Sequence, residues 1–315
     1  MDSSELQKIA QHSRSMREAG IALLLASGVL ALFLILPQPS QPAAPAPIAV
    51  ATSTVPDAFA QVPIEAKAAI VYDLATGETL YAKNADAQLP LASLTKLLTV
   101  YAALSELSPN TRVSIPADAT RLDAPHAFSA GQVFSLSDLA RLTLTASLND
   151  GAAAIAEATA ERENRTQSEM LASAAAGLAL SQTYAVNGSG LDESASVSGG
   201  YGSARDLARL AGALVKKAPE IAAATTHSSA QGTSEGGTSF SVKNTDPMVG
   251  TLPRLLLSKT GFTDLAGGNL ALVFDAGIEH PIAVIVLGSS QKARFTDGTA
   301  LVAATLAHFA GVSSL

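Results

Sequence analysis

Cysteine is absent from this 315-residue chain, and only 15% of its residues are charged. Without cysteine the protein has no disulfide, no thiolate nucleophile and no cysteine-ligated metal site. Its five histidines are scattered and never form an H-x-x-x-H pair, which gives a zinc hydrolase little support. We therefore expect neither a metal nor another cofactor. A net charge of −7 without any basic patch also argues against nucleic acid as a partner.

One long apolar run lies near the N-terminus, from Ala19 to Leu36. Its 18 residues contain no charge. As a helix they would be roughly 27 Å long, enough to cross the hydrocarbon core of a bilayer. Lysine and arginine precede the run, and none follows until Lys67. The positive-inside rule therefore predicts a cytoplasmic tail (1–18), a single-pass anchor in the cell membrane (19–36) and an extracytoplasmic remainder. The alternative is a cleavable signal peptide, with candidate sites at Ala44-Pro45-Ala46 and Ala58-Phe59-Ala60.

Beyond the apolar run, the composition changes twice. Residues 37–61 are rich in proline and alanine (PQPSQPAAPAP), which predicts an extended, semi-rigid linker. A folded domain is expected over residues 62–312. Alternating apolar residues predict a β-hairpin at 68–72 and 79–82, and later strands at 254–259, 269–274 and 281–287. Helical spacing predicts a helix opening at Ser93 and others at 136–146, 151–161, 167–180, 203–217 and 294–309, with a polar loop at 225–239. This order indicates an antiparallel sheet with helices packed on it.

The first motif that can carry chemistry is Ser93-Leu94-Thr95-Lys96, at the expected start of a helix. Residues three apart lie on the same helix face, so the lysine amine can reach the serine hydroxyl. Serine is a weak nucleophile and needs an adjacent base, and lysine can serve if its pKa is lowered by burial or by a second cation. The helix N-terminus also places backbone N–H groups near the carbonyl under attack.

Two further motifs complete a candidate site. Ser147-Leu148-Asn149 lies between two expected helices, where the hydroxyl can relay a proton and the amide can orient Lys96 and hold a substrate amide. Lys259-Thr260-Gly261 follows at the end of an expected strand. Its lysine and threonine can bind a carboxylate, and its glycine lets another backbone approach the strand edge.

Each motif alone is weak evidence. A second S-x-x-K occurs at Ser289–Lys292 and a second S-x-N at Ser108–Asn110, so chance produces both patterns in this very chain. Taken singly, the serine and asparagine are as well explained as helix caps, and the lysines as solvated charges. Their order along the chain and their positions at a helix start, between helices and at a strand favour the functional interpretation.

Taken together, these residues resemble the low-molecular-weight penicillin-binding proteins, the serine-type D-Ala-D-Ala carboxypeptidases and endopeptidases (peptidase S11). The resemblance covers roughly residues 66–309. It rests on the stretches LPLASLTKLL, LSDLARLTLTASLNDGAAAIA, NGSGL, YGSARDLARLAGAL, KNTDPMV and SKTGFTDLAG. It implies an α+β fold of the β-lactamase/transpeptidase type, with a five-stranded antiparallel sheet flanked by helices and a helical subdomain.

The resemblance also implies a role for each site residue. Ser93 would be the acylated nucleophile and Lys96 its general base, with Ser147 and Asn149 in the proton-relay and substrate-orienting element. A further set would bind the substrate: Lys259 and Thr260 its terminal carboxylate, Gly261 its backbone, and the backbone N–H groups of Ser93 and Phe262 its oxyanion. The expected partners are peptidoglycan stem peptides and β-lactams, which would acylate Ser93 and inhibit the enzyme.

The chain departs from the family pattern at two positions. Leu148 stands where the family usually has glycine, and Phe262 stands where many carboxypeptidases have histidine or tyrosine. S-K-T-G-F with K-N-T-D-P is similar to the endopeptidase branch, so carboxypeptidase and endopeptidase activity both stay open. A β-lactamase is a weaker alternative because no E-x-x-L-N lies between the second and third motifs. A non-catalytic cell-wall-binding protein is the alternative from another class, and the intact motif set argues against it.

Overall fold

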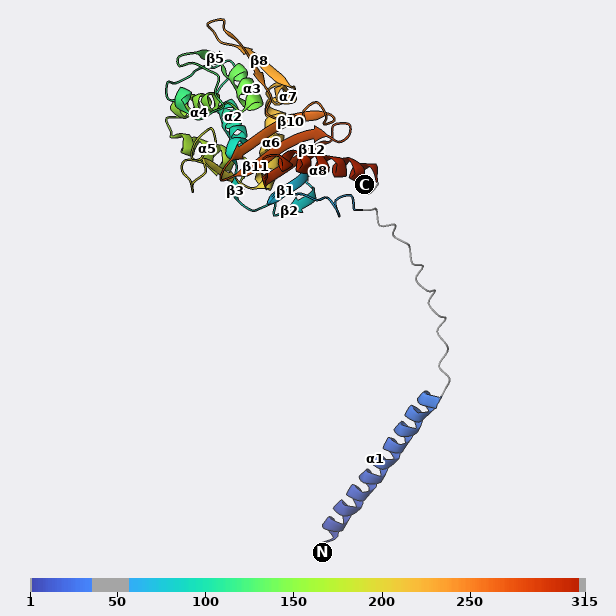
Figure 1. Ribbon diagram of the computed structural model, residues 1–315. Helices are drawn as coiled ribbons and strands as arrows, with labels where there is room; N and C mark the ends of the chain where they lie inside the picture. The colour runs from blue at the N-terminus through green and yellow to red at the C-terminus, as the bar shows by residue number, and fades with distance from the viewer. Residues whose placement is uncertain (1, 36–56, 312–315) are drawn as a thin grey trace. The chain divides into compact units, whose positions relative to one another are not determined.

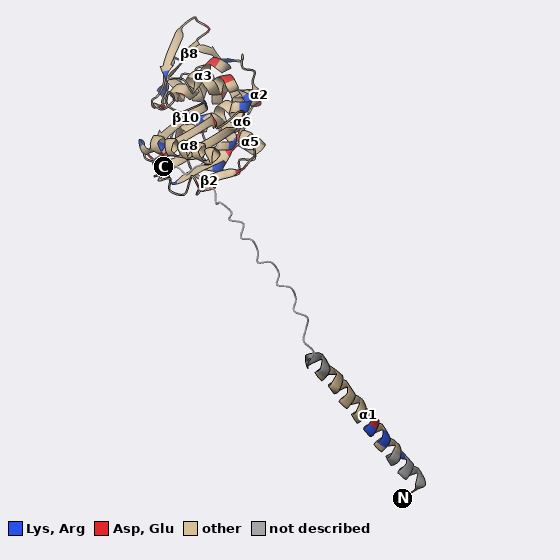
Figure 2. Cartoon of the chain, turned by 90° about the vertical axis from the view of Figure 1, so that its right-hand side faces the viewer, with Lys and Arg blue, Asp and Glu red and all other residues tan. Residues whose placement is uncertain are grey.

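A computed structural model describes residues 2–35 and 57–311 of the chain. The chain divides into two units, residues 1–54 and 55–315 (Figure 1). In the N-terminal unit, helix α1 (Ser3–Ile35) has its charged residues before Ala19, and Figure 2 shows the rest of its described length without them. No helix among the described residues is long and apolar enough to cross a membrane. Leu36, residues 37–56 of the expected linker and residue 312 of the expected domain lie outside the described residues.

The second unit is built on a five-stranded antiparallel sheet with the strand order β10-β11-β12-β1-β2. These strands are β1 (Ala68–Asp73), β2 (Thr79–Lys83), β10 (Leu255–Thr263), β11 (Gly267–Asp275) and β12 (Pro281–Ser289). The first strand pairs with the last, so that Val71 lies opposite Val284. The expected α+β fold with a five-stranded antiparallel sheet is confirmed.

Both faces of this sheet are buried under helices. Alternate residues of β1 point to opposite faces, as the two-residue period of a strand requires. Ile70 belongs to the core cluster that contains α6 (Ala204–Lys217), and Val71 to the cluster that contains α8 (Ala293–Ala310). Ala58 and Phe59, assigned to the linker from the sequence, are buried, and Phe59 packs in this second cluster. The folded part therefore extends beyond residue 62 toward the N-terminus.

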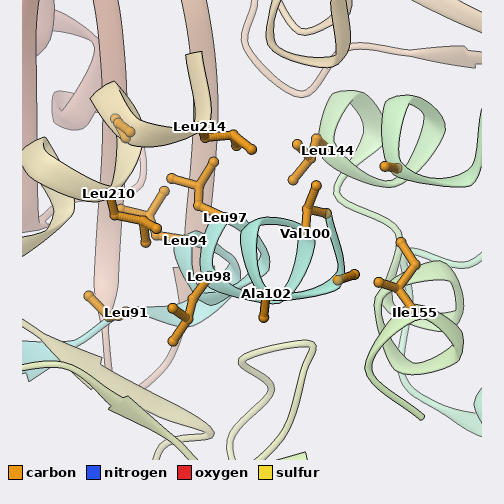
Figure 3. Close-up of a cluster of buried hydrophobic side chains, with 14 of the residues drawn as sticks. Leu91, Leu94, Leu97, Leu98, Val100, Ala102, Leu144, Ile155, Leu210 and Leu214 are labelled. Atoms are coloured by element: carbon orange, nitrogen blue, oxygen red, sulfur yellow. The ribbon is translucent and has the colours of Figure 1, made fainter. Parts of the chain in front are cut away.

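The helical subdomain surrounds α2 (Thr95–Glu106). Figure 3 shows Leu97, Leu98 and Val100 of this helix among leucines of α6, Leu144 of α3 (Leu136–Ala146) and Ile155 of α4 (Asn149–Glu163). Leu97 and Val100 are fully buried. Further helices are α5 (Gln167–Gly177) and α7 (Pro219–Ala224). Because every residue of α2 from Thr95 to Val100 is buried, its N-terminal turn is held in a fixed position.

Short strands and turns connect these layers. Strands β3 (Leu89–Pro90), β7 (Gly200–Gly202) and β6 (Tyr184–Ala185) form one small sheet, and β4 (Arg112–Ser114) pairs with β5 (Val133–Ser135). The described residues also include the 3₁₀ turns η1 (Ala92–Leu94) and η2 (Ala119–Arg121). The β3-β7-β6 sheet matters for the site because β3 leads directly into η1.

Several predicted elements differ in their bounds from the structure. The helix expected at 167–180 ends at Gly177, and the helix expected to open at Ser93 begins at Thr95. The polar loop at 225–239 contains strand β8 (Ser229–Thr233), which pairs with β9 (Ser239–Lys243), because α3 covers one side of β8 and buries Ala230. The helix expected from residue 151 begins at Asn149. The strand expected to end at Lys259 continues to Thr263 because its residues pair with β11 throughout, so the K-T-G motif lies within the strand.

Candidate active site

Ser93 lies in the η1 turn at the head of α2 and is half-buried. Leu91 and Leu94, on either side of it, are almost completely buried and fix the turn to the core. Ala92 has φ = 48°, a left-handed conformation that costs a non-glycine residue of order 1 kcal/mol or more. The backbone before Ser93 is therefore held by its surroundings in a conformation that the local sequence does not favour.

Lys96 reaches back from the first turn of α2 to this serine. Its Nζ is 2.9 Å from Ser93 Oγ, 2.7 Å from Asn149 Oδ1 and 2.7 Å from the Ser189 carbonyl oxygen. The side chain has no exposed surface. Burial lowers the pKa of Lys96 from 10.5 to about 7, against the opposing effect of the Asp150 carboxylate. Near neutral pH a large fraction of Lys96 is therefore uncharged and able to accept the Ser93 proton.

The second motif lies between α3 and α4. Ser147 is the C-cap of α3 in the left-handed conformation, with φ = 60°, and Asn149 is the first residue of α4. The Asn149 Nδ2 donates to the Asp123 carbonyl oxygen at 2.8 Å, and its backbone N–H donates to the Pro125 carbonyl oxygen at 2.7 Å. These bonds fix the amide so that its oxygen faces Lys96.

Lys259 lies on β10, the edge strand of the sheet, and is 1% exposed. Its Nζ donates to Ser147 Oγ at 2.8 Å and to the Thr260 carbonyl oxygen at 2.6 Å. Burial lowers the pKa of Lys259 well below 10.5, and the nearby charges of Lys96 and Arg294 lower it further. The charge of Lys96 therefore acts directly on Lys259. A carboxylate bound beside Lys259 would oppose this effect and favour the charged form of the lysine.

The remaining residues of the third motif, and Phe262 after them, also lie on β10. Thr260 Oγ1 is 2.6 Å from Thr245 Oγ1, whereas Phe262 is 42% exposed. A Cβ atom added at Gly261 would lie 3.3 Å from the Ser93 nitrogen and 3.0 Å from the Leu91 carbonyl oxygen. Glycine thus lets β10 approach the nucleophile turn itself. The structure therefore brings the three motifs together around Ser93.

The structure adds residues that no motif contained. Arg294, at the start of α8, is 8% exposed and donates from Nη1 to the Gly261 carbonyl oxygen at 2.7 Å. Burial lowers the pKa of Arg294, and the Asp246 carboxylate opposes this effect. Asp246 accepts a hydrogen bond from the Ser258 hydroxyl at 2.6 Å. Only the letters K-N-T-D-P could have pointed to Asp246 or Thr245, and nothing in the local sequence marks Arg294.

Asp150 follows Asn149 and is fully buried. Its carboxylate accepts hydrogen bonds from the backbone N–H groups of Ala127, Phe128 and Gly151 at 2.7–2.8 Å. These bonds fix the position of the carboxylate, whose charge acts on Lys96. Among the described residues, no group of three or more histidine, aspartate or glutamate side chains could hold a metal ion.

Comparison with known proteins gives a consistent result. The chain matches the Peptidase S11 family, described as D-alanyl-D-alanine carboxypeptidase, over residues 53–291. It is 30% identical to the D-alanyl-D-alanine endopeptidase of Pseudomonas aeruginosa, over 81% of this chain and 83% of that protein. It is 27% identical to the D-alanyl-D-alanine carboxypeptidase DacF of Bacillus subtilis, over 76% of this chain but only 61% of that protein.

A solved structure supports the same fold. Penicillin-Binding Protein D2 of Listeria monocytogenes, in its ampicillin-bound form, superposes with a TM-score of 0.66 at 29% identity. The match covers 77% of this chain and 98% of that protein. The expected β-lactamase/transpeptidase-type fold is confirmed.

Proposed function

The chain belongs to the D-alanyl-D-alanine carboxypeptidase family, peptidase S11. We therefore propose that the protein cleaves D-alanyl peptide bonds of peptidoglycan and that Ser93 is the nucleophile that becomes acylated. The observation that supports this most directly is the 2.9 Å hydrogen bond between Lys96 Nζ and Ser93 Oγ, made by a lysine whose pKa is lowered to about 7. A serine hydroxyl beside an uncharged amine is the arrangement that nucleophilic catalysis requires.

In the acylation step, uncharged Lys96 takes the proton of Ser93 Oγ while that oxygen bonds to the carbonyl carbon of the scissile D-alanyl bond. The carbonyl oxygen becomes negative and accepts hydrogen bonds from the backbone N–H groups of Ser93 and Phe262. Gly261 supports this role, since its missing side chain lets the strand that carries Phe262 approach the Ser93 nitrogen.

Breaking the peptide bond requires a proton on the leaving amine. Ser147 supplies it from its hydroxyl. Lys259, whose Nζ donates to Ser147 Oγ at 2.8 Å, then gives a proton to Ser147. Lys259 and Thr260 hold the terminal carboxylate of the substrate, while the Asn149 side chain orients Lys96 and the substrate amide. Water then attacks the acyl carbon and passes its proton through Ser147 to Lys259, while Lys96 returns its proton to Ser93 Oγ, so that the carboxylic acid product leaves and both lysines regain their starting states.

Ser93→Ala should abolish covalent labelling of the purified protein by a fluorescent penicillin, because the acylated oxygen is gone. Thermal stability should change little, since Ser93 is only half-buried. Ser289→Ala is the matched control. Ser289 begins the second S-x-x-K stretch but donates to Asp297 at 2.7 Å, so this variant should lose stability and keep labelling. Labelling that survives Ser93→Ala would place the nucleophile elsewhere.

Lys259→Ala should lower kcat/KM on a D-Ala-D-Ala peptide by about 10²-fold or more, because a charge-assisted hydrogen bond to a carboxylate contributes a few kcal/mol. Steady-state kinetics measure this loss. Lys292→Ala removes an exposed lysine and should leave kcat/KM unchanged. An unchanged kcat/KM for Lys259→Ala would exclude Lys259 from substrate recognition.

Two activities of the family are candidates for the physiological reaction. The second candidate is cleavage of D-Ala–diaminopimelate cross-links. It is favoured by Phe262, which follows the K-T-G motif and is 42% exposed, and by the 30% identity to the endopeptidase of Pseudomonas aeruginosa. Digestion of purified muropeptides distinguishes the two. Release of free D-alanine identifies a carboxypeptidase, and conversion of cross-linked dimers to monomers identifies an endopeptidase.

We also propose that residues 19–36 anchor the chain in the cell membrane, with the catalytic unit outside the cytoplasm. The 18 uncharged residues and the basic residues confined to their N-terminal side support this proposal. Membrane fractionation of the full chain, compared with a chain that begins at Asp57, tests it. Recovery of the full chain in the soluble fraction would contradict the anchor.

A further inference from the structure

One loop contacts both Lys96 and Ala92, the residue before Ser93. It runs from Asn187 to Leu191 (N-G-S-G-L), between β6 and β7. The Ser189 carbonyl oxygen accepts a hydrogen bond from Lys96 Nζ at 2.7 Å, and Ser189 is 4% exposed. Of the acceptors around this amine, the Ser189 carbonyl belongs to none of the three sequence motifs.

The same loop contacts the nucleophile turn. Gly190 has φ = 77°, and a Cβ atom added to it would lie 2.0 Å from the Ala92 carbonyl oxygen. Ala92 is the residue held at φ = 48° directly before Ser93. Ser189 therefore contacts the general base, and Gly190 lies against the backbone of Ala92, the residue before the nucleophile.

The Asn187 side chain determines the shape of this loop. Its Oδ1 accepts hydrogen bonds from the Ser189 N–H at 3.1 Å, the Ser189 hydroxyl at 3.0 Å and the Gly190 N–H at 2.7 Å. Its Nδ2 donates to the Leu191 carbonyl oxygen at 3.0 Å and to the Glu193 carboxylate. A single carboxamide thus fixes the direction of the Ser189 and Gly190 backbone.

We propose that Asn187 is a positioning residue for acylation, which acts by holding the Ser189 carbonyl on Lys96 and Gly190 against Ala92. This inference rests on the proposed role of Ser93 and Lys96. The hydrogen bonds of the Asn187 side chain are to its own loop and to Glu193, so its effect passes through the relative placement of the base and the nucleophile. A misplacement of about 1 Å between reacting groups can lower a rate by roughly 10²-fold.

The test is stopped-flow acylation by a β-lactam, which separates the dissociation constant of the non-covalent complex from the acylation rate constant. Asn187→Ala should lower the acylation rate constant about 10- to 100-fold and change the dissociation constant less than about threefold. Measurements are made well below the melting temperature of each variant, on protein shown to be folded. Ser189→Ala removes one of the three bonds to Asn187 Oδ1 and keeps the carbonyl, so a smaller loss of the same kind is expected.

Asn84→Ala is the matched control. Asn84 also fixes backbone through its amide, donating to the Lys67 carbonyl oxygen at 2.9 Å at a positive φ, but it makes no contact with the site residues described above. This variant should lose stability without losing acylation rate. If Asn187→Ala is folded with an acylation rate constant within twofold of wild type, the inference is wrong. If Asn187→Ala does not fold, an unchanged rate in Ser189→Ala overturns it. A wild-type protein that is never acylated would instead overturn the proposed function, and this inference with it.

Discussion

Replacing Lys96 with methionine is expected to lower the acylation rate constant by about 10²- to 10⁴-fold, the usual contribution of a general base. Methionine fills a similar volume in this fully buried position but cannot accept the Ser93 proton. The rate constant is measured by stopped-flow labelling with a β-lactam. Lys83→Met is the control, because Lys83 bonds only the Ile64 carbonyl oxygen among the bonds described, at 3.2 Å.

The pH dependence of the wild-type protein provides a second measure of the same residue. Lys96 acts as a base only when it is uncharged, and its pKa is lowered to about 7. The acylation rate should therefore rise as the pH increases through about 7 and level off above it. Lys96→Arg should stay inactive over the whole range, because a guanidinium keeps its proton. A rate that is independent of pH between 5 and 9, or an active Lys96→Arg variant, would contradict the role of Lys96 as the base.

Gly190→Ala is expected to destabilise the catalytic unit by about 3 kcal/mol or more. Two penalties add at this position. The left-handed φ of 77° is unfavourable for alanine, and the new Cβ would lie 2.0 Å from the Ala92 carbonyl oxygen and 2.7 Å from Thr95 Oγ1. The backbone must shift to relieve the overlap, and the shift reaches the residue before Ser93. Denaturant unfolding gives the stability change, and β-lactam labelling of the folded fraction gives the effect on the site.

Gly131→Ala separates the two penalties. Gly131 has nearly the same φ, 79°, but no atom lies within 4 Å of an added Cβ. This variant should lose only the conformational part, about 1–2 kcal/mol, and should keep full labelling. Equal losses of stability in the two variants would mean that the loop around Gly190 shifts without cost. The overlap with Ala92 would then make no contribution to the destabilisation of Gly190→Ala.

The sequence alone determined the elements that depend on local patterns. Alternating apolar residues gave the strands of the central sheet, and the β1–β2 hairpin lies close to where the alternation predicted it. The cap at Ser135 is also local, since its side chain accepts the Asp138 N–H three residues later. The three motifs were recognisable for the same reason, because the residues of each motif lie next to or within a few positions of one another in the chain.

Burial could not be predicted in this way. On the helix face, Lys96 is compatible with a solvated charge, and Lys259 at a strand is compatible with an exposed one. Only the packing of the helical subdomain against the edge of the sheet removes water from both amines, and their lowered pKa values follow from that removal. The hairpin of β8 and β9 was missed for a related reason: its polar residues pair as strands because α3 covers one side of them.

The contacts that complete the site were decided by the tertiary structure. Lys96 bonds a backbone carbonyl 93 residues away, at Ser189, and a carbonyl has no side-chain signature in a sequence. Arg294 reaches the Gly261 carbonyl oxygen from a different element, 33 residues later. The motifs show which chemical groups the chain contains. Which of them share one dry environment depends on long-range packing, and that is fixed only when the sheet and the helical subdomain come together.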